Sequence, residues 1–531
     1  MKRNWLLIAI SVVLLVSGMG LLSLGEGRIT NPDKLVLLIY GEPTTLDPAV
    51  SYTIRGWLIL RNTYDRLVGY DGADSTKFVP RLATHWSCSD DGLVWTFYLR
   101  KDAKFHDGTP VTAKDVKYSF DRVLRMNQGP AWMLSQCMDL NSTKVIDDYT
   151  VQITLTKPYA AFLSVLSIIT ASIVNSRQVE AHGGVIDGAE NEWASRNEYG
   201  SGPYQLKEWI PNDRVVLERF DDYWRGPAPL KQVEVRVVPE VGTEVMLVKR
   251  GDADIVYEFP ETNIPDLLGS SGVVVEPFPS FNIDFVVINC KTGVLQDVSL
   301  RQALAWTVPY DKLIKYIYQG YAQRLYGPIP EGMFGYTKPE TIYTFNLDKA
   351  AQLLDLAGYT KNTSGARIDP HTGKPLTLEI SVGQGRETAQ QIAVMWQNEL
   401  RKLGIQATIR VGTFSVLHNL MRQGELDLLI AGWYPDYADP DDYTDALIGP
   451  AHFWKAYSNA AMNELIDKAK WEPNRDKRAD LYAQIQELAA KEVPYIWLAQ
   501  KKSIAVRRTW VKGFYYNPVM PPDFYAISKG W

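Results

Sequence analysis

The sequence predicts an α/β protein with two or three lobes, and three observations lead to this class. The chain has 531 residues, more than a single hydrophobic core usually organises. From about residue 299 to residue 489, segments with helical periodicity alternate with short apolar runs of strand length. The composition, with 46% hydrophobic and 22% charged residues, is that of an ordinary globular protein. Alternation of this kind is typical of helices packed on a sheet.

The first third of the chain carries clear strand and helix patterns. Continuous or alternating apolar residues predict strands at 34–40, 95–100 and 151–156, and apolar residues at helical spacing predict a helix at 113–124. Thr112 can cap that helix at its N-terminus, with Asp115 three residues later at the distance of a capping box.

The rest of the chain begins with sheet and continues with alternating elements. The glycine- and proline-rich cluster 200–204 separates one segment from the next. After it, strands are expected at 204–209, 215–219 and 233–238. The pattern is helical from 299 to 318, and later helices at about 347–357, 387–403 and 461–489 alternate with strands at 376–382, 405–411 and 426–431. Two short strands, 495–498 and 503–506, are expected to return to the first lobe.

The N-terminal residues predict export. Lys2 and Arg3 precede an uncharged, largely apolar stretch from Asn4 to Gly25. This stretch approaches the roughly 20 residues that span a bilayer as a helix, so a cleaved signal peptide and a retained membrane anchor within residues 1–30 both remain open. The positive charges lie before the stretch, which places the body of the protein outside the cytoplasm, in the periplasm or at the outer face of the membrane.

Charge and cysteine content exclude several classes of function. The net charge is −5 and no basic block occurs, so we expect no nucleic-acid partner. Three cysteines, Cys88, Cys137 and Cys290, leave two alternatives: a Cys88–Cys137 disulfide or three separate thiols. No CxxC pair or histidine cluster is present, so we expect no metal and no cofactor.

The run from Gly432 to Tyr443 is the strongest candidate for a site. It follows the apolar strand expected at 426–431, and ligand crevices of α/β sheets lie at the carboxyl ends of strands. Its two prolines predict a rigid loop without helix. It also carries four carboxylates: Asp436, Asp439, Asp441 and Asp442. A buried acid in such a loop requires a cationic partner, whereas the alternative is a solvated acidic turn.

Several motifs in this chain resemble a known family. The longest runs from Leu82 to Val116 and includes Asp107-Gly108 and the Thr112/Asp115 helix start. Further matching pieces occur in the same order at 45–48, 200–204, 222–224, 249–255, 299–304 and 350–359. On these motifs the chain resembles the peptide-type (oligopeptide, dipeptide and nickel) solute-binding proteins, family 5, of ATP-binding-cassette (ABC) importers.

The resemblance implies a two-lobed periplasmic-binding-protein (Venus-flytrap) fold of class α/β with an extra inserted domain. Lobe I would comprise residues 31–53, 197–285 and 492–531, the inserted domain residues 54–196, and lobe II residues 286–491. The chain would cross between lobes near 285–289 and 492–496. A ligand held between the lobes stabilises the closed form, and closure signals to the membrane transporter.

The resemblance also implies site residues. Asp436, in the stretch Gly432-Trp433-Tyr434, falls where peptide binders of the family hold the ligand's α-ammonium. The backbones of Gly432 and Tyr434, and of Tyr52 to Ile54 from the other lobe, fall where relatives pair with an extended peptide.

Two further residues carry alternatives. Ile430 and Ala389 stand where a peptide binder of the family has Arg and His. Arg386 is therefore the candidate to neutralise a peptide carboxylate in their place. The alternative is that Arg386 is a solvated charge at the start of a helix. Trp132 either lines the cleft or packs under its own domain.

Three functions are weighed. The first is a receptor that delivers short peptides to an ABC permease, acting as a monomer without enzymatic activity. The second is the same role for cello- or manno-type oligosaccharides, because 16 Trp would suit ring stacking. The third is an extracytoplasmic hydrolase using paired carboxylates of the 436–442 run. No GxSxG, HExxH or P-loop pattern supports the third.

Overall fold

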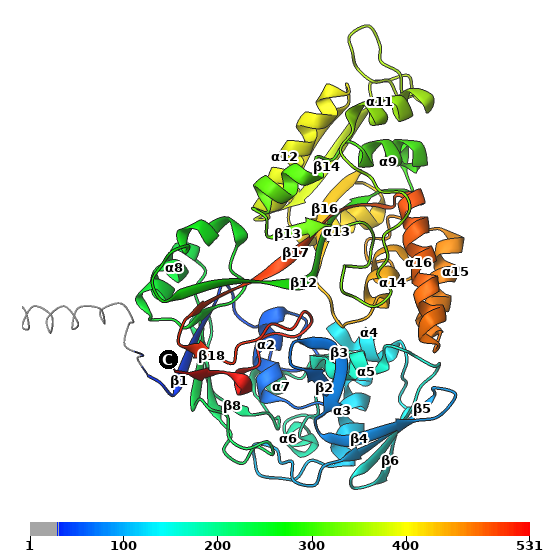
Figure 1. Cartoon of the computed structure of the whole chain (residues 1–531). Helices are drawn as coiled ribbons and strands as arrows, with labels where there is room; N and C mark the ends of the chain where they lie inside the picture. The colour runs from blue at the N-terminus through cyan, green and yellow to red at the C-terminus, as the bar shows by residue number, and fades with distance from the viewer. Residues whose placement is uncertain (1–28, 30, 531) are drawn as a thin grey trace, which may run out of the picture.

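The computed structural model describes residue 29 and residues 31–530. The predicted signal or anchor segment, 1–30, therefore lies outside the described residues except for Ile29. One 11-stranded sheet runs through most of the molecule (Figure 1). Its strands follow the spatial order β15 (Gln406–Gly412), β14 (Thr377–Gly383), β16 (Leu428–Trp433), β12 (Val273–Ile288), β17 (Tyr495–Arg508), β11 (Ile255–Val256), β1 (Lys34–Ile39), β10 (Gln232–Val237), β9 (Arg214–Arg219) and β8 (Tyr204–Ile210), with β13 (Ala322–Arg324) paired to β17.

Two long antiparallel strands, β12 and β17, join the two ends of this sheet (Figure 1). We call the part built on β14, β15 and β16 the upper half, and the part built on β1 and β8 to β11 the lower half, after their places in that figure. The pairing of β12 with β17 is irregular between Pro279 and Ile283, where the two strands pass from one half to the other. Proline cannot donate to the ladder, so Pro279 removes one donor at the start of this irregular stretch.

The upper half is an α/β layer around a parallel core. Strand β14 lies between β15 and β16 and is parallel to both. Helix α12 (Glu387–Lys402) packs on this sheet through Ile392, Trp396 and Leu400, which recur every four residues and are buried. Helices α9 (Val298–Ala305), α10 (Tyr310–Lys312), α11 (Leu347–Leu356), α13 (Phe414–Gln423), α14 (Asp441–Ile448), α15 (Ala460–Trp471) and α16 (Arg475–Glu492) complete this half.

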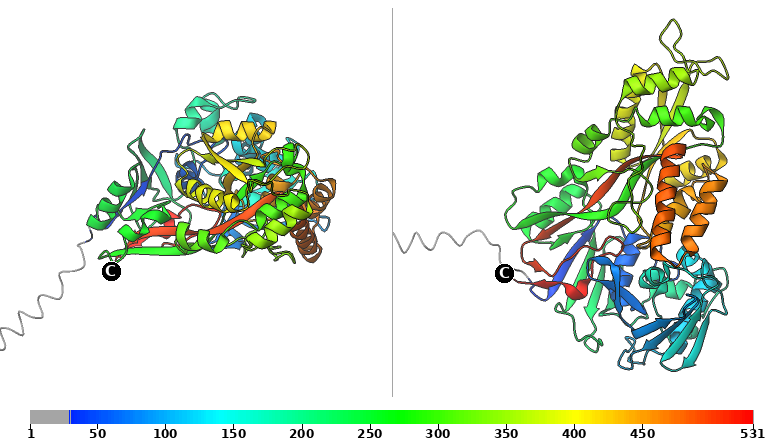
Figure 2. Two further views of the ribbon diagram at one scale, coloured as in Figure 1. Left: turned by 90° about the horizontal axis from the view of Figure 1, so that it is seen from above. Right: turned by 45° about the vertical axis from the view of Figure 1, so that its right-hand side comes forward.

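The lower half carries a separate small sheet, which the right-hand view of Figure 2 shows beneath the orange helices. Its order is β4 (Ala83–Cys88), β5 (Val94–Leu99), β7 (Thr150–Thr154) and β6 (Thr143–Asp147), next to the hairpin β2 (Val68–Asp71) and β3 (Asp74–Pro80). Helices α2 (Ile54–Thr63), α3 (Ala113–Met126), α4 (Trp132–Ser135), α5 (Phe162–Ser167), α6 (Ser176–Ala181), α7 (Glu192–Arg196) and α8 (Val241–Arg250), and the pair β18 (Val511–Lys512) and β19 (Ser528–Lys529), complete it.

Most predicted elements are present within a few residues of their expected bounds. The strands predicted at 34–40, 95–100 and 233–238 are β1, β5 and β10, and the helix predicted at 113–124 is α3. Its capping box is present as well, because the Asp115 carboxylate accepts from the Thr112 backbone N–H at 3.0 Å.

Four predictions of the secondary structure are wrong in extent. The helical stretch 299–318 is interrupted before Tyr310, where Pro309 has no N–H to continue the ladder. The helix predicted at 461–489 is two helices, α15 and α16, separated at Pro473. The two short strands 495–498 and 503–506 are one strand, β17. The run predicted as loop to Tyr443 becomes helix α14 at Asp441, because Pro440 is tolerated at a helix start.

The α/β class is confirmed, whereas the predicted domain boundaries stay a prediction. Within residue 29 and residues 31–530, no helix is both long and apolar enough to cross a membrane.

Candidate functional site

A cavity of about 660 Å³ lies where β12 and β17 pass between the halves. The lower half contributes Ile54 and the segment 257–263, the upper half contributes 385–389 and 430–434, and the crossing strands contribute 282–284 and 501–504. A volume of this size suits a small organic ligand, and walls from both halves are what a closing clamp requires.

The upper wall offers a free strand edge. Strand β14 pairs with β16 from Leu428 to Ile430 and stops there. Strand β16 continues to Trp433 and pairs over that end with β12, Asp284 lying opposite Gly432. The backbone of residues 431–433 therefore has a partner strand on its β12 side, while its other side faces the cavity. An extended peptide can add to such an edge as a strand.

Asp436 lies two residues beyond Tyr434, the last cavity residue of this segment. It is 7% exposed, and its Oδ2 accepts from the Tyr52 hydroxyl at 2.8 Å. The Trp132 Nε1 in turn donates to the Tyr52 hydroxyl at 3.3 Å. Three residues from three distant parts of the sequence thus form one hydrogen-bonded chain that links the two halves.

The other carboxylates of the run are already engaged. Asp439 forms a two-pronged ion pair with Arg478, whose Nη1 and Nη2 lie 2.8 and 2.5 Å from its oxygens. Asp441 accepts from the Tyr159 hydroxyl at 2.7 Å. Asp442 accepts from the Trp433 Nε1 at 3.3 Å and from the Asp436 backbone N–H at 3.0 Å. The run is therefore buried and structured, and the alternative of a solvated acidic turn is wrong.

Burial shapes the electrostatics of this cluster. Loss of solvation raises the pKa of Asp436 to about 7 and that of Asp441 to about 8, and it raises the pKa of Asp442 as well. The hydrogen bond from the Tyr52 hydroxyl opposes the shift at Asp436. Among the described residues, Asp436 has no ion-pair partner, so a cation placed beside it would favour its ionised form.

Two cationic side chains, those of Arg386 and Lys501, lie close to Gly432 and to Asp284, the residue opposite it on β12. A Cβ added to Gly432 would lie 3.5 Å from the Arg386 Nη2. The Lys501 Nζ lies 3.5 Å from the Asp284 Oδ1, while the Tyr318 hydroxyl donates to Asp284 Oδ2 at 2.9 Å. Arg386 is the exposed N-cap residue of α12 and part of the cavity wall, so its role as a partner of a peptide carboxylate stays a prediction.

The structure places the predicted site residues in two adjoining groups. Ile54, Arg386, Gly432, Trp433 and Tyr434 line the cavity. The remaining three, Tyr52, Trp132 and Asp436, form the hydrogen-bonded chain. Trp132 also lies against Tyr437, with ring centroids 6.2 Å apart, so it faces the acidic run instead of packing solely within its own part of the chain. Their roles toward a ligand stay predictions.

Most of the lower and crossing walls was not predicted from the sequence, and its polar members include Tyr257, Glu258, Asp284 and Lys501. Glu258 is partly buried, has a positive φ of 64°, and its pKa is raised to about 7 by burial. A non-glycine residue in that conformation is strained and such strain gathers at functional sites. The sequence carried no signal for Glu258 beyond a charged residue after a short apolar run, because the conformation depends on the fold.

Metal and disulfide chemistry have little support. Within residue 29 and residues 31–530, no group of three or more His, Cys, Asp or Glu side chains is placed to hold a metal ion. Cys88, Cys137 and Cys290 are free thiols, with Cys88 exposed and Cys137 buried, so the alternative of a Cys88–Cys137 disulfide is wrong in this structure. The absence of a cofactor stays a prediction.

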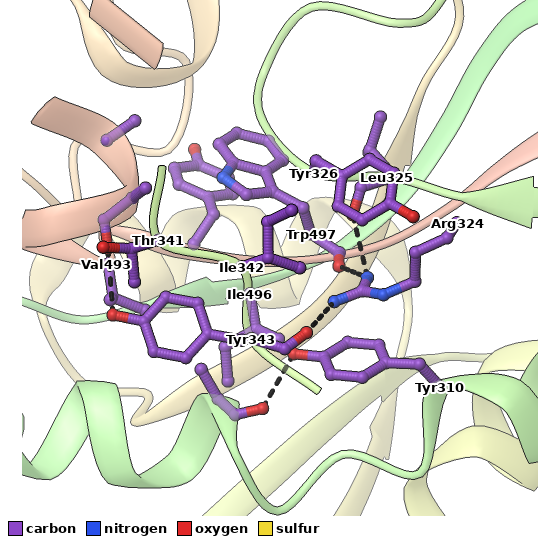
Figure 3. A pocket seen from close by; sticks show the side chains of 14 residues that line it. Tyr310, Arg324, Leu325, Tyr326, Thr341, Ile342, Tyr343, Val493, Ile496 and Trp497 are labelled. Carbon is purple, nitrogen blue, oxygen red and sulfur yellow. Dashed lines mark hydrogen bonds between the residues drawn. The ribbon is translucent and has the colours of Figure 1, made fainter. Parts of the chain in front are cut away.

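A second, small pocket shows how tightly the crossing strand is held (Figure 3). Arg324 donates to the carbonyl oxygens of Trp497 at 2.5 Å and Tyr343 at 3.1 Å, and its guanidinium lies 3.1 Å from the centre of the Tyr310 ring. The volume of about 20 Å³ admits little more than one water molecule. We regard it as a packing feature that fixes β17, not as a ligand site.

Replacing Gly432 by alanine is expected to destabilise the fold. The new Cβ would lie 2.5 Å from the Asp284 Oδ1 and 2.9 Å from the Ile283 carbonyl oxygen. Relief requires a shift of β12 or β16, at a cost of about 1–3 kcal/mol. Urea unfolding of Gly432→Ala measures this cost. Gly242→Ala, where no atom lies within 4 Å of the new Cβ, is the matched control and should be neutral or stabilising.

The ligand-free protein is expected to gain stability from Asp436 as the pH falls. Its folded-state pKa of about 7 lies above the ordinary value of 3.8, so the folded state binds this proton more tightly than the unfolded state. The contribution is present at low pH and is lost as the pH rises through 7. The difference in unfolding free energy between wild type and Asp436→Asn should therefore change by up to about 1.4 kcal/mol per pH unit between pH 5 and 7. A pH-independent difference would contradict the raised pKa.

Comparisons with known proteins agree with this architecture. Residues 77–455 match the family described as bacterial extracellular solute-binding proteins, family 5 middle. The chain is 32% identical over 503 residues to the "Probable D,D-dipeptide-binding periplasmic protein DdpA" of Escherichia coli, covering 93% of each chain. It is 27% identical over 486 residues to the "Dipeptide-binding protein" of the same organism, covering 88% of each.

A solved structure is similar as well. It is the ABC transporter-associated periplasmic binding protein DppA from Helicobacter pylori in complex with the peptide STSA, which is 26% identical with a TM-score of 0.77. The superposition covers 93% of this chain and 98% of that one. This likeness confirms the predicted two-lobed periplasmic-binding-protein fold.

Proposed function

Because the chain belongs to the bacterial extracellular solute-binding proteins of family 5, we propose that it captures short peptides outside the cytoplasm and delivers them to an ABC permease. The membership confirms the resemblance drawn from the motifs between Leu82 and Val116. The relatives named for dipeptides and the homologue solved with the peptide STSA support a peptide ligand.

One observation carries the proposal: Asp436 is a buried carboxylate that no cationic side chain among the described residues neutralises. A peptide α-ammonium supplies the missing charge. Tyr52 is 43% exposed, so its hydroxyl can share Asp436 with an incoming ammonium or swing away from it. Such a charge-assisted hydrogen bond contributes about 1.5–3 kcal/mol.

The arrangement favours short ligands. The Arg386 guanidinium lies beside Gly432, four residues before Asp436. Four residues span at most about 14 Å when extended. A peptide whose ammonium lies on Asp436 and whose carboxylate reaches Arg386 can therefore contain no more than about four residues, and its backbone would add to the free edge of β16.

Lobe closure would follow from contacts on both sides. The ligand would contact Ile54 and Tyr257 from the lower half and Arg386 and Trp433 from the upper half. Since these contacts form together when the halves approach, the ligand favours the closed form. The proposed lobes are residues 31–53, 197–285 and 492–531 against 286–491, with 54–196 inserted.

The proposal includes the protein's export, oligomeric state and lack of catalysis. The chain would leave the cytoplasm through its N-terminal segment, either as a cleaved signal or as an anchor. It would act as a monomer, without a cofactor, and would release the peptide chemically unchanged. The engagement of Asp439 by Arg478 leaves one carboxylate of the run committed to an ion pair, which weakens the hydrolase alternative.

An oligosaccharide ligand would use different features. Tyr40, Tyr257, Phe259 and Trp433 in the cavity wall could stack on sugar rings. Neutral sugars would leave the buried Asp436 without a cation, however, so the peptide ligand accounts for more of the site.

Calorimetry tests the proposal directly. The purified protein is titrated with di-, tri-, tetra- and hexapeptides, and with cello- and manno-oligosaccharides. Binding of the peptides up to about four residues, and their recovery intact by mass spectrometry after long incubation, is expected. Binding of sugars alone, or recovery of cleaved peptide, would contradict the proposal.

A further inference from the structure

A second cluster of charge lies in the lower half, away from the ligand cavity. Four arginines, Arg61, Arg66, Arg81 and Arg225, line a cavity of about 30 Å³ together with two aspartates, Asp65 and Asp523. The arginines come from the end of α2, the β2–β3 region and the connection between β9 and β10, and Asp523 comes from the C-terminal segment. The formal charge of these six side chains is +2.

Arg66 is the least satisfied member of the cluster. It is 7% exposed, and its Nη1 donates to the Tyr64 carbonyl oxygen at 3.4 Å, a long contact. Its Nε has no hydrogen-bond partner among the described residues. A buried guanidinium normally has each of its donors satisfied, because an unpaired buried charge is costly.

The two aspartates do not neutralise Arg66. Asp65 accepts from the Tyr223 hydroxyl and from the Trp224 Nε1, both at 3.0 Å, and these are neutral donors. Asp523 lies 3.8 Å from the Arg61 Nη2 and accepts from the Tyr515 hydroxyl at 2.8 Å. Asp65 therefore accepts hydrogen bonds from uncharged groups and feels the charges of Arg66 and Arg81 without an ion-pair contact. Asp523 pairs with Arg61.

In the described part of the chain, no carboxylate lies within ion-pair distance of the other two arginines, and their charges act on Asp523 from further away. Arg81 donates to the carbonyl oxygens of Pro80 and Tyr70, each at 3.2 Å. The Arg225 guanidinium lies 4.2 Å from the centre of the Tyr525 ring. Burial and the neighbouring charge of Arg61 lower the pKa of Arg66 to about 10, which leaves it charged at neutral pH.

We propose that this cavity binds a small inorganic anion of the size of chloride. Three arginines without a carboxylate in ion-pair contact line it, and an anion there would accept from the free Arg66 Nε and offset the excess positive charge. The volume is that of one or two water molecules and suits a monatomic ion. The site does not depend on the proposed peptide ligand.

The expected consequence is a chloride-dependent stability. The anion would tie α2, the β2–β3 region and the C-terminal segment together in the folded state, and a ligand that binds the folded state alone raises the melting temperature. Melting curves are recorded in sodium chloride and in sodium gluconate at equal ionic strength. The melting temperature should rise with chloride concentration and stay lower in gluconate. Equal melting temperatures in the two salts would overturn the proposal.

Single substitutions test whether the chloride-dependent stability arises from this cavity. Arg66→Met and, should that variant fold poorly, Arg81→Gln are expected to lose the difference between chloride and gluconate. Arg214→Gln is the control, because Arg214 pairs with Asp213 at 2.6 Å outside the cluster. It should keep the wild-type difference. A chloride effect that survives in Arg81→Gln at full size would place the anion elsewhere.

Crystallography with bromide gives the position. A crystal soaked in sodium bromide is expected to show an anomalous peak between Arg66 and Arg81. A peak confined to other places, or sulfate or phosphate seated in the cavity in preference to bromide, would contradict a chloride-sized site.

Discussion

Replacing Asp436 by asparagine is expected to weaken the binding of a di- or tripeptide by about 10- to 150-fold. The asparagine oxygen still accepts from Tyr52, whose hydroxyl lies 2.8 Å from the carboxylate, so the fold around the site should persist. What is lost is the charge that neutralises the ligand's ammonium, worth about 1.5–3 kcal/mol. Isothermal titration calorimetry at pH 8, where the Asp436 carboxyl is largely ionised, measures the loss.

Two further variants show whether the loss of affinity is specific to the Asp436 carboxylate. Asp427→Asn changes an aspartate just before β16, whose Oδ2 accepts from the Glu379 backbone N–H at 2.9 Å, and it should bind peptide as the wild type does. Tyr52→Phe removes the hydroxyl that covers Asp436 and should change affinity far less than Asp436→Asn. Wild-type affinity in Asp436→Asn would contradict the assigned role of this carboxylate.

Replacing Arg478 by methionine is expected to lower the free energy of unfolding by about 3–5 kcal/mol. Arg478 is 4% exposed and reaches Asp439, the Tyr482 hydroxyl at 2.9 Å and the Ala469 carbonyl oxygen at 2.9 Å. Removing the arginine leaves the Asp439 carboxylate buried without its cation, which is more costly than the pair itself is favourable. Urea unfolding followed by circular dichroism measures the change.

The control for Arg478 is an exposed ion pair on the neighbouring helix. Lys468 lies 2.6 Å from Glu464 at the surface of α15, and Lys468→Met should leave stability close to that of the wild type. The double variant Arg478→Met/Asp439→Asn should recover part of the loss. Equal stabilities of Arg478→Met and Lys468→Met would show that the buried pair does not organise the acidic run.

The sequence predicted individual helices and strands well where the apolar residues followed a single pattern, either helical or strand-like. Strand β1 and helix α3 were identified because continuous apolar residues and a capping box point to one structure each. Strand β12 was missed because Pro277 and Pro279 argue against a strand, although both pair with β17 and the register shifts only after Pro279. The length of β17 was missed for a related reason, since Gln500, Lys501 and Lys502 interrupt its apolar pattern.

The site was predicted in part. The run 432–443 could be located because carboxylates follow an apolar strand, and the resemblance to the family singled out Asp436 and Gly432 within it. The partners of that run could not: Tyr159, Arg478 and Tyr52 approach it from distant segments, and no local pattern signals such contacts. The start of helix α14 at Asp441 was hidden for the same reason, because the surrounding halves bury all four carboxylates of the run, where the sequence is equally compatible with a solvated turn.

The most direct test is a double comparison of free and N-acetylated tripeptide in wild type and in Asp436→Asn. Acetylation removes the ammonium and leaves the rest of the peptide unchanged. We expect acetylation to weaken binding to the wild type by about 10-fold or more and to have little effect on Asp436→Asn, because the two changes remove the same interaction. Equal losses on acetylation in both proteins would show that the ammonium is bound elsewhere.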